Sequence, residues 1–191
     1  MTTSRLEAFS DGVLAIIITI MVLQLNAPKE TTLEALSPKI GVFFSYLISF
    51  VYVGIYWNNH HHLFQYTEKV NGKILWANLH FLFWLSLVPF TTSWVGENHL
   101  DDSPLALYGF TLLMSGVSFI MLQMVIIKND PKYVSSKIIR VIKTDYQKVS
   151  LLIYTIGILL SYYVPWLAVV CYITPALLKI HSQIYHQKNT I

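Results

Sequence analysis

Three consecutive histidines, His60, His61 and His62, are the side chains of this sequence that most directly suggest metal chemistry. Successive residues of a helix point about 100° apart, so the three imidazoles fan over about 200° and cannot ligate one ion together. No glutamate follows them in a metalloprotease pattern. The single cysteine, Cys171, can form neither an internal disulfide nor a cysteine zinc site. The sequence therefore predicts no metal site.

Asp11 is an acid inside an apolar run that extends from residue 4 to residue 25. A carboxylate in a helix of membrane-spanning length is costly and needs a partner from protein or water. Trp57, His60 and His61 share a helical face near the end of a second apolar run, and Asn78 lies near the start of a third. We expect a histidine or an asparagine from these faces to pair with Asp11.

Thr19 is the one polar side chain between residues 16 and 23. Gly12, Ile16, Thr19 and Leu23 follow one another at spacings of 4, 3 and 4, which places them on one stripe of a helix, with Asp11 nearly opposite. Two interpretations are open for the threonine. Its hydroxyl bonds back to its own helix, or it forms a polar ring in a symmetric pore, between hydrophobic rings of Ile16 and Leu23.

The elements that carry these residues are membrane-length apolar runs. Hydrophobic residues make up 54% of the 191 residues and charged residues 12%, whereas a soluble domain carries about 25% charged residues. Each run is near the roughly 20 residues that a helix needs to cross a bilayer. We therefore expect an all-α membrane protein with one domain, 1–191, of six transmembrane helices: 4–25, 40–64, 74–95, 105–127, 149–164 and 167–184. Ser4 and Glu7 are spaced as a capping box at the start of the first.

The basic residues orient these helices. With the N-terminus inside, only Lys29 and Lys39 of the 13 lysines and arginines fall in outside segments. This bias predicts cytoplasmic N- and C-termini. The basic connection 128–148 is then expected to contact anionic lipid at the inner surface rather than nucleic acid.

Residues 52–56 read Tyr-Val-Gly-Ile-Tyr, a weak likeness to a potassium-channel filter. The stretch lacks the second glycine and lies within a continuous apolar run, whereas such a filter needs extended backbone with inward carbonyls. We expect no P-loop selectivity filter.

The pattern Arg5-x-x-x-Phe9-Ser10-Asp11 resembles the signature of the transmembrane protein 175 family, which comprises endolysosomal potassium channels and their prokaryotic relatives. Three further stretches are similar to the family: 16–19, 57–61 with Phe64, and 78–79 followed by 87–90. Together these stretches span the first three helices, about half of the chain.

The resemblance implies a potassium-selective channel whose unit has six helices. A chain with one such unit resembles the prokaryotic form, a homotetramer in the cell membrane in which the first helix of each subunit lines a hydrophobic pore. Ile16 would form the constriction, with Leu23 one turn further on, and Thr19 would contribute to potassium preference. Phe9, Ser10 and Asp11 would pack behind the pore against the second and third helices, and Arg5 belongs to the signature without an assigned partner. Potassium is then the permeant ion, with no cofactor.

Three other functions compete with a leak-type channel. A proton-coupled or small-solute secondary transporter would use Asp11 and the histidines as relay groups. A membrane enzyme would need a nucleophile, a base and an acid, and Ser, His and Asp here have no diagnostic spacing, so we expect no enzymatic activity. A scaffold would transport nothing.

Overall fold

The structure is a computed structural model that describes residues 2–65, 67, 69–98, 100–129 and 145–188, without the side chains of 145 and 181–188. The described chain is all-α, as predicted. Its elements are α1 (Thr3–Leu23), the 3₁₀ helix η1 (Leu33–Lys39), α2 (Ile40–Gln65), α3 (Gly72–Ser86), α4 (Val88–Glu97), α5 (Asp102–Asn129), α7 (Asp145–Ser161) and α8 (Pro165–Lys188). Most of the basic connection predicted at 128–148 lies outside the described residues.

Four helical stretches are long and apolar enough to cross a membrane: Thr3–Leu23, Leu33–Gln65, Gly72–Glu97 and Asp102–Asn129. The last two predicted spans correspond to α7, with 17 residues, and α8, with 24 residues, whose apolar stretches are Tyr146–Ser161 and Pro165–Ile180. At 1.5 Å per residue, α7 covers about 26 Å and α8 about 36 Å, against a hydrocarbon core of about 30 Å. The prediction of six helical rods therefore holds, and length together with apolar composition supports four of them as full spans.

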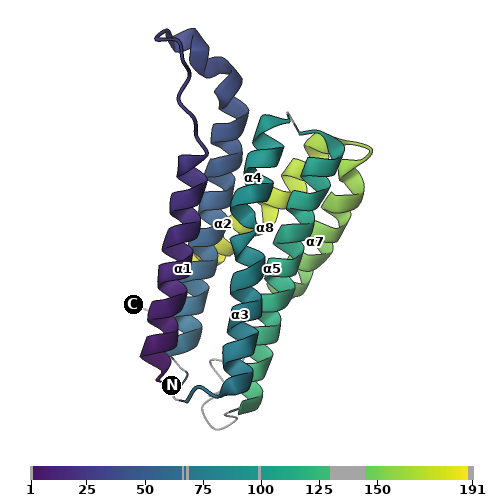
Figure 1. The fold of residues 1–191 in the computed structure, drawn as a ribbon. Coiled ribbons are helices and arrows are strands. Elements are labelled where there is room, and N and C mark those ends of the chain that lie inside the picture. The colour runs from purple at the N-terminus through teal and green to yellow at the C-terminus, as the bar shows by residue number, and fades with distance from the viewer. Residues whose placement is uncertain (1, 66, 68, 99, 130–144, 189–191) are drawn as a thin grey trace.

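The predicted third span, 74–95, is two helices that meet at Leu87. Pro89 has no N–H and disfavours helical backbone before it, so the hydrogen-bond ladder cannot run unbroken through this point. The Leu87 N–H instead donates to the Trp84 carbonyl at 3.3 Å, and the ladder resumes where the Thr91 N–H donates to the Leu87 carbonyl at 3.1 Å. The predicted span is therefore present as one candidate membrane crossing, Gly72–Glu97, made of two pieces stacked end to end (Figure 1).

The predicted capping box at the start of α1 was wrong. The helix begins one residue earlier, at Thr3, and its N-cap, Thr2, makes no side-chain cap hydrogen bond. Ser4 is inside the first turn, and the Glu7 carboxylate is bonded to another helix instead.

The helices form two groups, one around α1 and one around α5, α7 and α8. α1 contacts α2, α3 and α4 at one edge of the molecule, where Figure 1 shows it in purple. On the other side, α5 packs on α3 and α7, and α7 packs on α8. Tyr172 of α8 is the largest fully buried side chain. It lies against Gly109 and Gly157, where a side chain would collide with its ring, and its hydroxyl is 3.0 Å from Ser161 Oγ.

Candidate pore helix and the polar cluster behind it

α1 has two faces of different character. Its buried residues recur every three or four positions: Leu6, Ser10, Leu14, Ile17 and Met21. This periodicity turns one face toward α2, α3 and α4 and leaves the opposite face uncovered by the rest of the described chain.

The four stripe residues, Gly12, Ile16, Thr19 and Leu23, all lie on that uncovered side, which we call the open face. Ile16 is 60% exposed and Leu23 is 72% exposed. Along the helix axis, the distance from Ile16 to Leu23 is about 10 Å at 1.5 Å per residue. The residues predicted to line a pore are therefore available to a second copy of the chain, to lipid or to water.

The Thr19 hydroxyl donates to the Ala15 carbonyl at 2.8 Å. This is the back-bond of the first interpretation. The bond uses the hydroxyl hydrogen and leaves the oxygen lone pairs free. Because Thr19 is exposed, those lone pairs are available to a cation, so the back-bond is compatible with the second interpretation.

Behind the open face, three helices share a cluster of buried polar groups made of Ser10, Asn78 and His60, each with no exposed surface. Asn78 Nδ2 lies 2.9 Å from Ser10 Oγ, and Asn78 Oδ1 lies 2.8 Å from His60 Nε2. The Ser10 hydroxyl donates to the Leu6 carbonyl at 2.9 Å. These bonds connect α1, α3 and α2 at one level of the bundle. We call this set the buried cluster.

The direction of each bond in the buried cluster follows from the serine. Since the Ser10 hydrogen is committed to Leu6, its oxygen can only accept, and the Asn78 amide must donate to it. The Asn78 carbonyl then faces His60, so His60 donates through Nε2–H. Its Nδ1 is buried with no hydrogen-bond partner among the described residues, which fits a neutral ring with a bare lone pair at that position.

A second set of contacts joins α1 to α2 through partly buried residues of α1. The Trp57 indole N–H donates to Asp11 Oδ1 at 3.1 Å, and His61 Nδ1 lies 2.6 Å from Glu7 Oε1. His61 Nε2 is also 2.8 Å from the amide nitrogen of Gln65. The expectation that a histidine or asparagine pairs with Asp11 was wrong: the indole takes that place, and the histidine pairs with Glu7.

Glu7 was missed as a contact of this site, although the sequence contains a signal for it. Glu7 and Asp11 are four residues apart, and so are Trp57 and His61, so each pair forms one helical ridge. Two antiparallel helices that carry such ridges can match them in reverse order. This is the order observed, with Asp11 to Trp57 and Glu7 to His61.

Phe9 and Arg5 lie elsewhere than the other signature residues. Phe9 is 50% exposed and is turned away from the buried face of α1, so in the single chain it does not pack behind the stripe as expected. The reason is rotational, since Phe9 precedes the buried Ser10 by one residue and so points about 100° away from it. Arg5 is exposed, and no hydrogen bond or ion pair joins it to another part of the described chain.

No group of three His, Cys, Asp or Glu side chains capable of holding a metal ion occurs in the described part of the chain. The three histidines diverge. His60 belongs to the buried cluster, His61 pairs with Glu7, and His62 Nδ1 lies 3.3 Å from Gln65 Oε1.

Comparison with known proteins bears on this arrangement. The family model described as endosomal/lysosomal potassium channel TMEM175 matches residues 5–89. A protein named as a potassium channel from Chryseobacterium sp. strain P1-3 is 50% identical over 179 residues, which cover 93% of this chain and 92% of that protein. The chain belongs to the TMEM175 family.

Two further proteins extend the comparison. A potassium channel from Streptomyces collinus is 32% identical over 125 residues, which cover 61% of each chain. The crystal structure of a lysosomal potassium-selective channel TMEM175 homologue from Chamaesiphon minutus superposes with a TM-score of 0.79 at 24% identity, covering 94% of this chain and 97% of that one. The superposition shows that the present chain has the same fold.

The segment matched by the TMEM175 family model corresponds to the first helices of the structure. Residues 5–89 include nearly all of α1, the whole of α2 and α3, and the start of α4. This segment therefore holds both the open face and the buried cluster, whereas α5, α7 and α8 lie beyond it. The part of the chain that carries the family's sequence pattern thus includes two of the three helices that α1 packs against, α2 and α3.

Proposed function

We propose that this TMEM175-family chain is a potassium-selective channel of the prokaryotic cell membrane. In this proposal four identical chains surround one pore, and the open face of α1 from each chain lines it. The 50% identical relative, named a potassium channel, supports the ion and the activity. The observation that carries the pore assignment is the open face itself, a stripe of α1 that the rest of the described chain leaves uncovered.

The composition of the open face favours a pore over a purely lipid-facing surface. The exposed side of α2 carries bulky aromatic residues, among them Phe43, Phe44 and Phe50, which suit contact with lipid. The open face instead carries Gly12 before its large apolar residues and the hydroxyl of Thr19 between them. A closed ring of four copies uses heterologous contacts under cyclic symmetry, and this places the same stripe of every copy on the central axis.

The mechanism follows from the order of the side chains along that axis. Rings of Ile16 and Leu23 form hydrophobic constrictions, which exclude water when narrow and admit partly hydrated ions when wider. Thr19 oxygens between them supply weak coordination. Potassium is preferred because the larger ion loses less hydration energy on entry. Arg5 and Arg140 are the only arginines, so no arginine-rich voltage-sensing helix exists and we propose a leak-type conductance with both chain termini in the cytoplasm.

Ion flux from proteoliposomes tests the proposal. Vesicles loaded with potassium should discharge rapidly when potassium can flow down its gradient, and sodium-loaded vesicles should discharge more slowly. The secondary-transporter alternative instead requires a flux that saturates and depends on a proton gradient. Saturating, proton-coupled flux would contradict the channel proposal, and absence of flux for both ions would favour a scaffold.

A further inference from the structure

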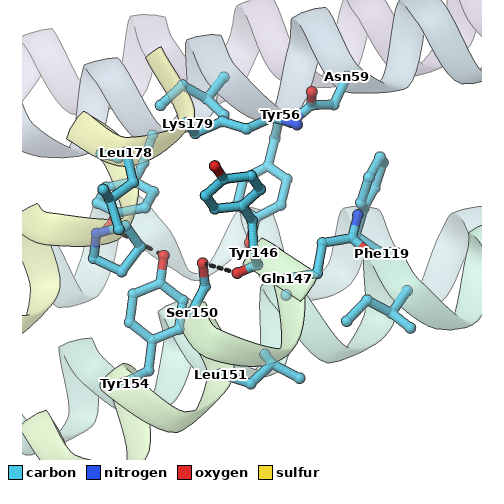
Figure 2. A pocket seen from close by; sticks show the side chains of 16 residues that line it. Tyr56, Asn59, Phe119, Tyr146, Gln147, Ser150, Leu151, Tyr154, Leu178 and Lys179 are labelled. Carbon is cyan, nitrogen blue, oxygen red and sulfur yellow. Dashed lines mark hydrogen bonds between the residues drawn. The ribbon is translucent and has the colours of Figure 1, made fainter. Parts of the chain in front are cut away.

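A cavity with a mostly apolar wall and a few polar side chains lies in the half of the molecule that the proposed pore does not use. It has a volume of about 80 Å³ and is lined by residues of α2, α5, α7 and α8, with none from α1 (Figure 2). One water needs about 10–15 Å³ of such space, so the cavity has room for about five waters or for one polyatomic group.

One wall of this cavity carries a cation without a visible counter-charge. Lys179 of α8 is half-buried at the cavity. The ion pair found among the described side chains is Glu7 with His61, at a different site, so no described carboxylate lies within ion-pair distance of the Lys179 ammonium. Lys179 lies within the predicted sixth span, 167–184, and a cation within a membrane span normally pairs with an anion or a polar group. The lysine therefore marks the cavity as a place for a negatively charged group.

Several other lining residues can hydrogen-bond such a group. Figure 2 shows Lys179 and Tyr56 on one side of the cavity and Ser150 on the other, with Tyr146 reaching between them. Neither the Tyr56 nor the Tyr146 hydroxyl has a hydrogen-bond partner among the described residues, and Gln147 adds an amide to the lining. One ammonium and several uncommitted donors fit an anion with several acceptor oxygens, which a phosphate provides.

The exposed rim of the cavity and the predicted topology indicate where that phosphate comes from. Leu178, beside the lysine, lines the cavity and is 40% exposed, so an acyl chain can lie over it while the headgroup points inward. The predicted topology puts this end of α8 at the cytoplasmic leaflet, where anionic lipids concentrate. We propose that the cavity binds the phosphate of an anionic phospholipid from the inner leaflet, with Lys179 as its charged ligand.

Native mass spectrometry of the full-length protein in detergent tests this proposal, with phosphatidylglycerol as the probe. Lys179→Gln should weaken retention of the lipid by about tenfold or more, the range expected for a hydrogen bond to a charged group. Lys179→Arg should retain most of the binding. Lys148→Gln is the matched control, because Lys148 is exposed on α7 and does not line the cavity. Tyr146→Phe provides a second variant that removes a single hydroxyl.

Four results would overturn the proposal. One is equal retention of phosphatidylglycerol by wild-type protein and Lys179→Gln. Another is an equal loss in Lys148→Gln, which would assign the binding to general surface charge. The third is complete displacement of the lipid by millimolar inorganic phosphate, which would identify a free anion as the ligand. Retention of phosphatidylcholine in place of phosphatidylglycerol would likewise count against an anionic lipid.

Discussion

At the level of single residues, the buried cluster determines which way α1 faces. Ser10, Asn78 and His60 form bonds whose directions are all fixed, so each group has one orientation that satisfies its neighbours. A rotation of α1 by one residue would move Ser10 away from Asn78 and leave buried polar groups unpaired. The cluster thus holds the open face on the side away from α2 and α3.

Ser10→Ala tests this role. The substitution removes the acceptor of the Asn78 amide and leaves a buried N–H unpaired. We expect the free energy of unfolding to fall by about 1–2 kcal/mol, between the cost of an unsatisfied buried group and the smaller values measured for hydrogen bonds within bilayers. Thermal unfolding in detergent measures the effect. Ser4→Ala is the control, since Ser4 is exposed on the same helix, and equal melting temperatures for the two variants would contradict the role.

Thr19→Val removes the one hydroxyl of the open face at nearly constant volume. If the Thr19 oxygen favours potassium over sodium by about 1 kcal/mol, the size of a typical hydrogen bond, its removal should lower the potassium-over-sodium preference about fivefold. The reversal potential in mixed potassium and sodium solutions measures this preference. Thr19→Ser keeps the oxygen and should behave like the wild type. An unchanged reversal potential in Thr19→Val would show that the hydroxyl does not contribute to selectivity.

The sequence predicted which residues share a face better than it predicted which residues bond. Helical spacing alone grouped Ile16, Thr19 and Leu23, because a regular helix repeats every 3.6 residues. The partner of Asp11 was assigned wrongly, since spacing within one helix does not define how far the neighbouring helix is shifted along the bundle axis. That offset is set by the contacts between α1 and α2, which place Trp57 rather than a histidine opposite Asp11.

At the level of helices, the far half of the molecule depends on close approach at two glycines. A Cβ built on Gly109 would lie 2.0 Å from the Tyr172 hydroxyl oxygen, and one on Gly157 would lie 2.5 Å from the Tyr172 ring. α5 and α7 can therefore both contact this buried ring of α8 only because neither presents a side chain there.

Gly109→Ala should consequently lower the free energy of unfolding by about 1–3 kcal/mol, the usual cost of overpacking a core. Gly54→Ala in α2 is the matched control, because a Cβ at that position meets nothing within 4 Å. Since alanine favours helix more than glycine does, the control should be neutral or stabilised by up to about 1 kcal/mol. Thermal unfolding of both variants measures the difference, and equal stability would contradict the packing described for Tyr172.

Helix positions were largely predictable from the sequence, and helix ends less so. The apolar run predicted at 40–64 matches α2 within one residue, because a long apolar run leaves few alternatives. Hydropathy along 74–95 does not reveal the break at Leu87, since it does not depend on the missing N–H of Pro89. The predicted span 149–164 begins four residues after the start of α7 at Asp145. The reason is that polar residues such as Gln147 and Lys148 belong to the first turns of that helix.

At the level of the whole molecule, the proposed pore exists only when copies of the chain assemble. Ile16 would then form a ring whose hydrophobicity controls hydration of the pathway. Ile16→Asn should raise single-channel conductance severalfold by admitting water at the constriction. Ile16→Leu preserves the apolar ring and should leave conductance near that of the wild type. Recordings from planar bilayers measure both variants, and unchanged conductance in Ile16→Asn would remove this residue from the pore.

Accessibility of the open face during conduction tests the proposed pore most directly. Cys171 is the single native cysteine, so a Cys171→Ala background allows one new cysteine at a time in α1. A positively charged thiol reagent should block potassium current through Thr19→Cys and Leu23→Cys, whereas Met21→Cys, on the buried face, should be unaffected. Block of Met21→Cys with no effect on Thr19→Cys and Leu23→Cys would contradict the assignment of the open face as the potassium pathway.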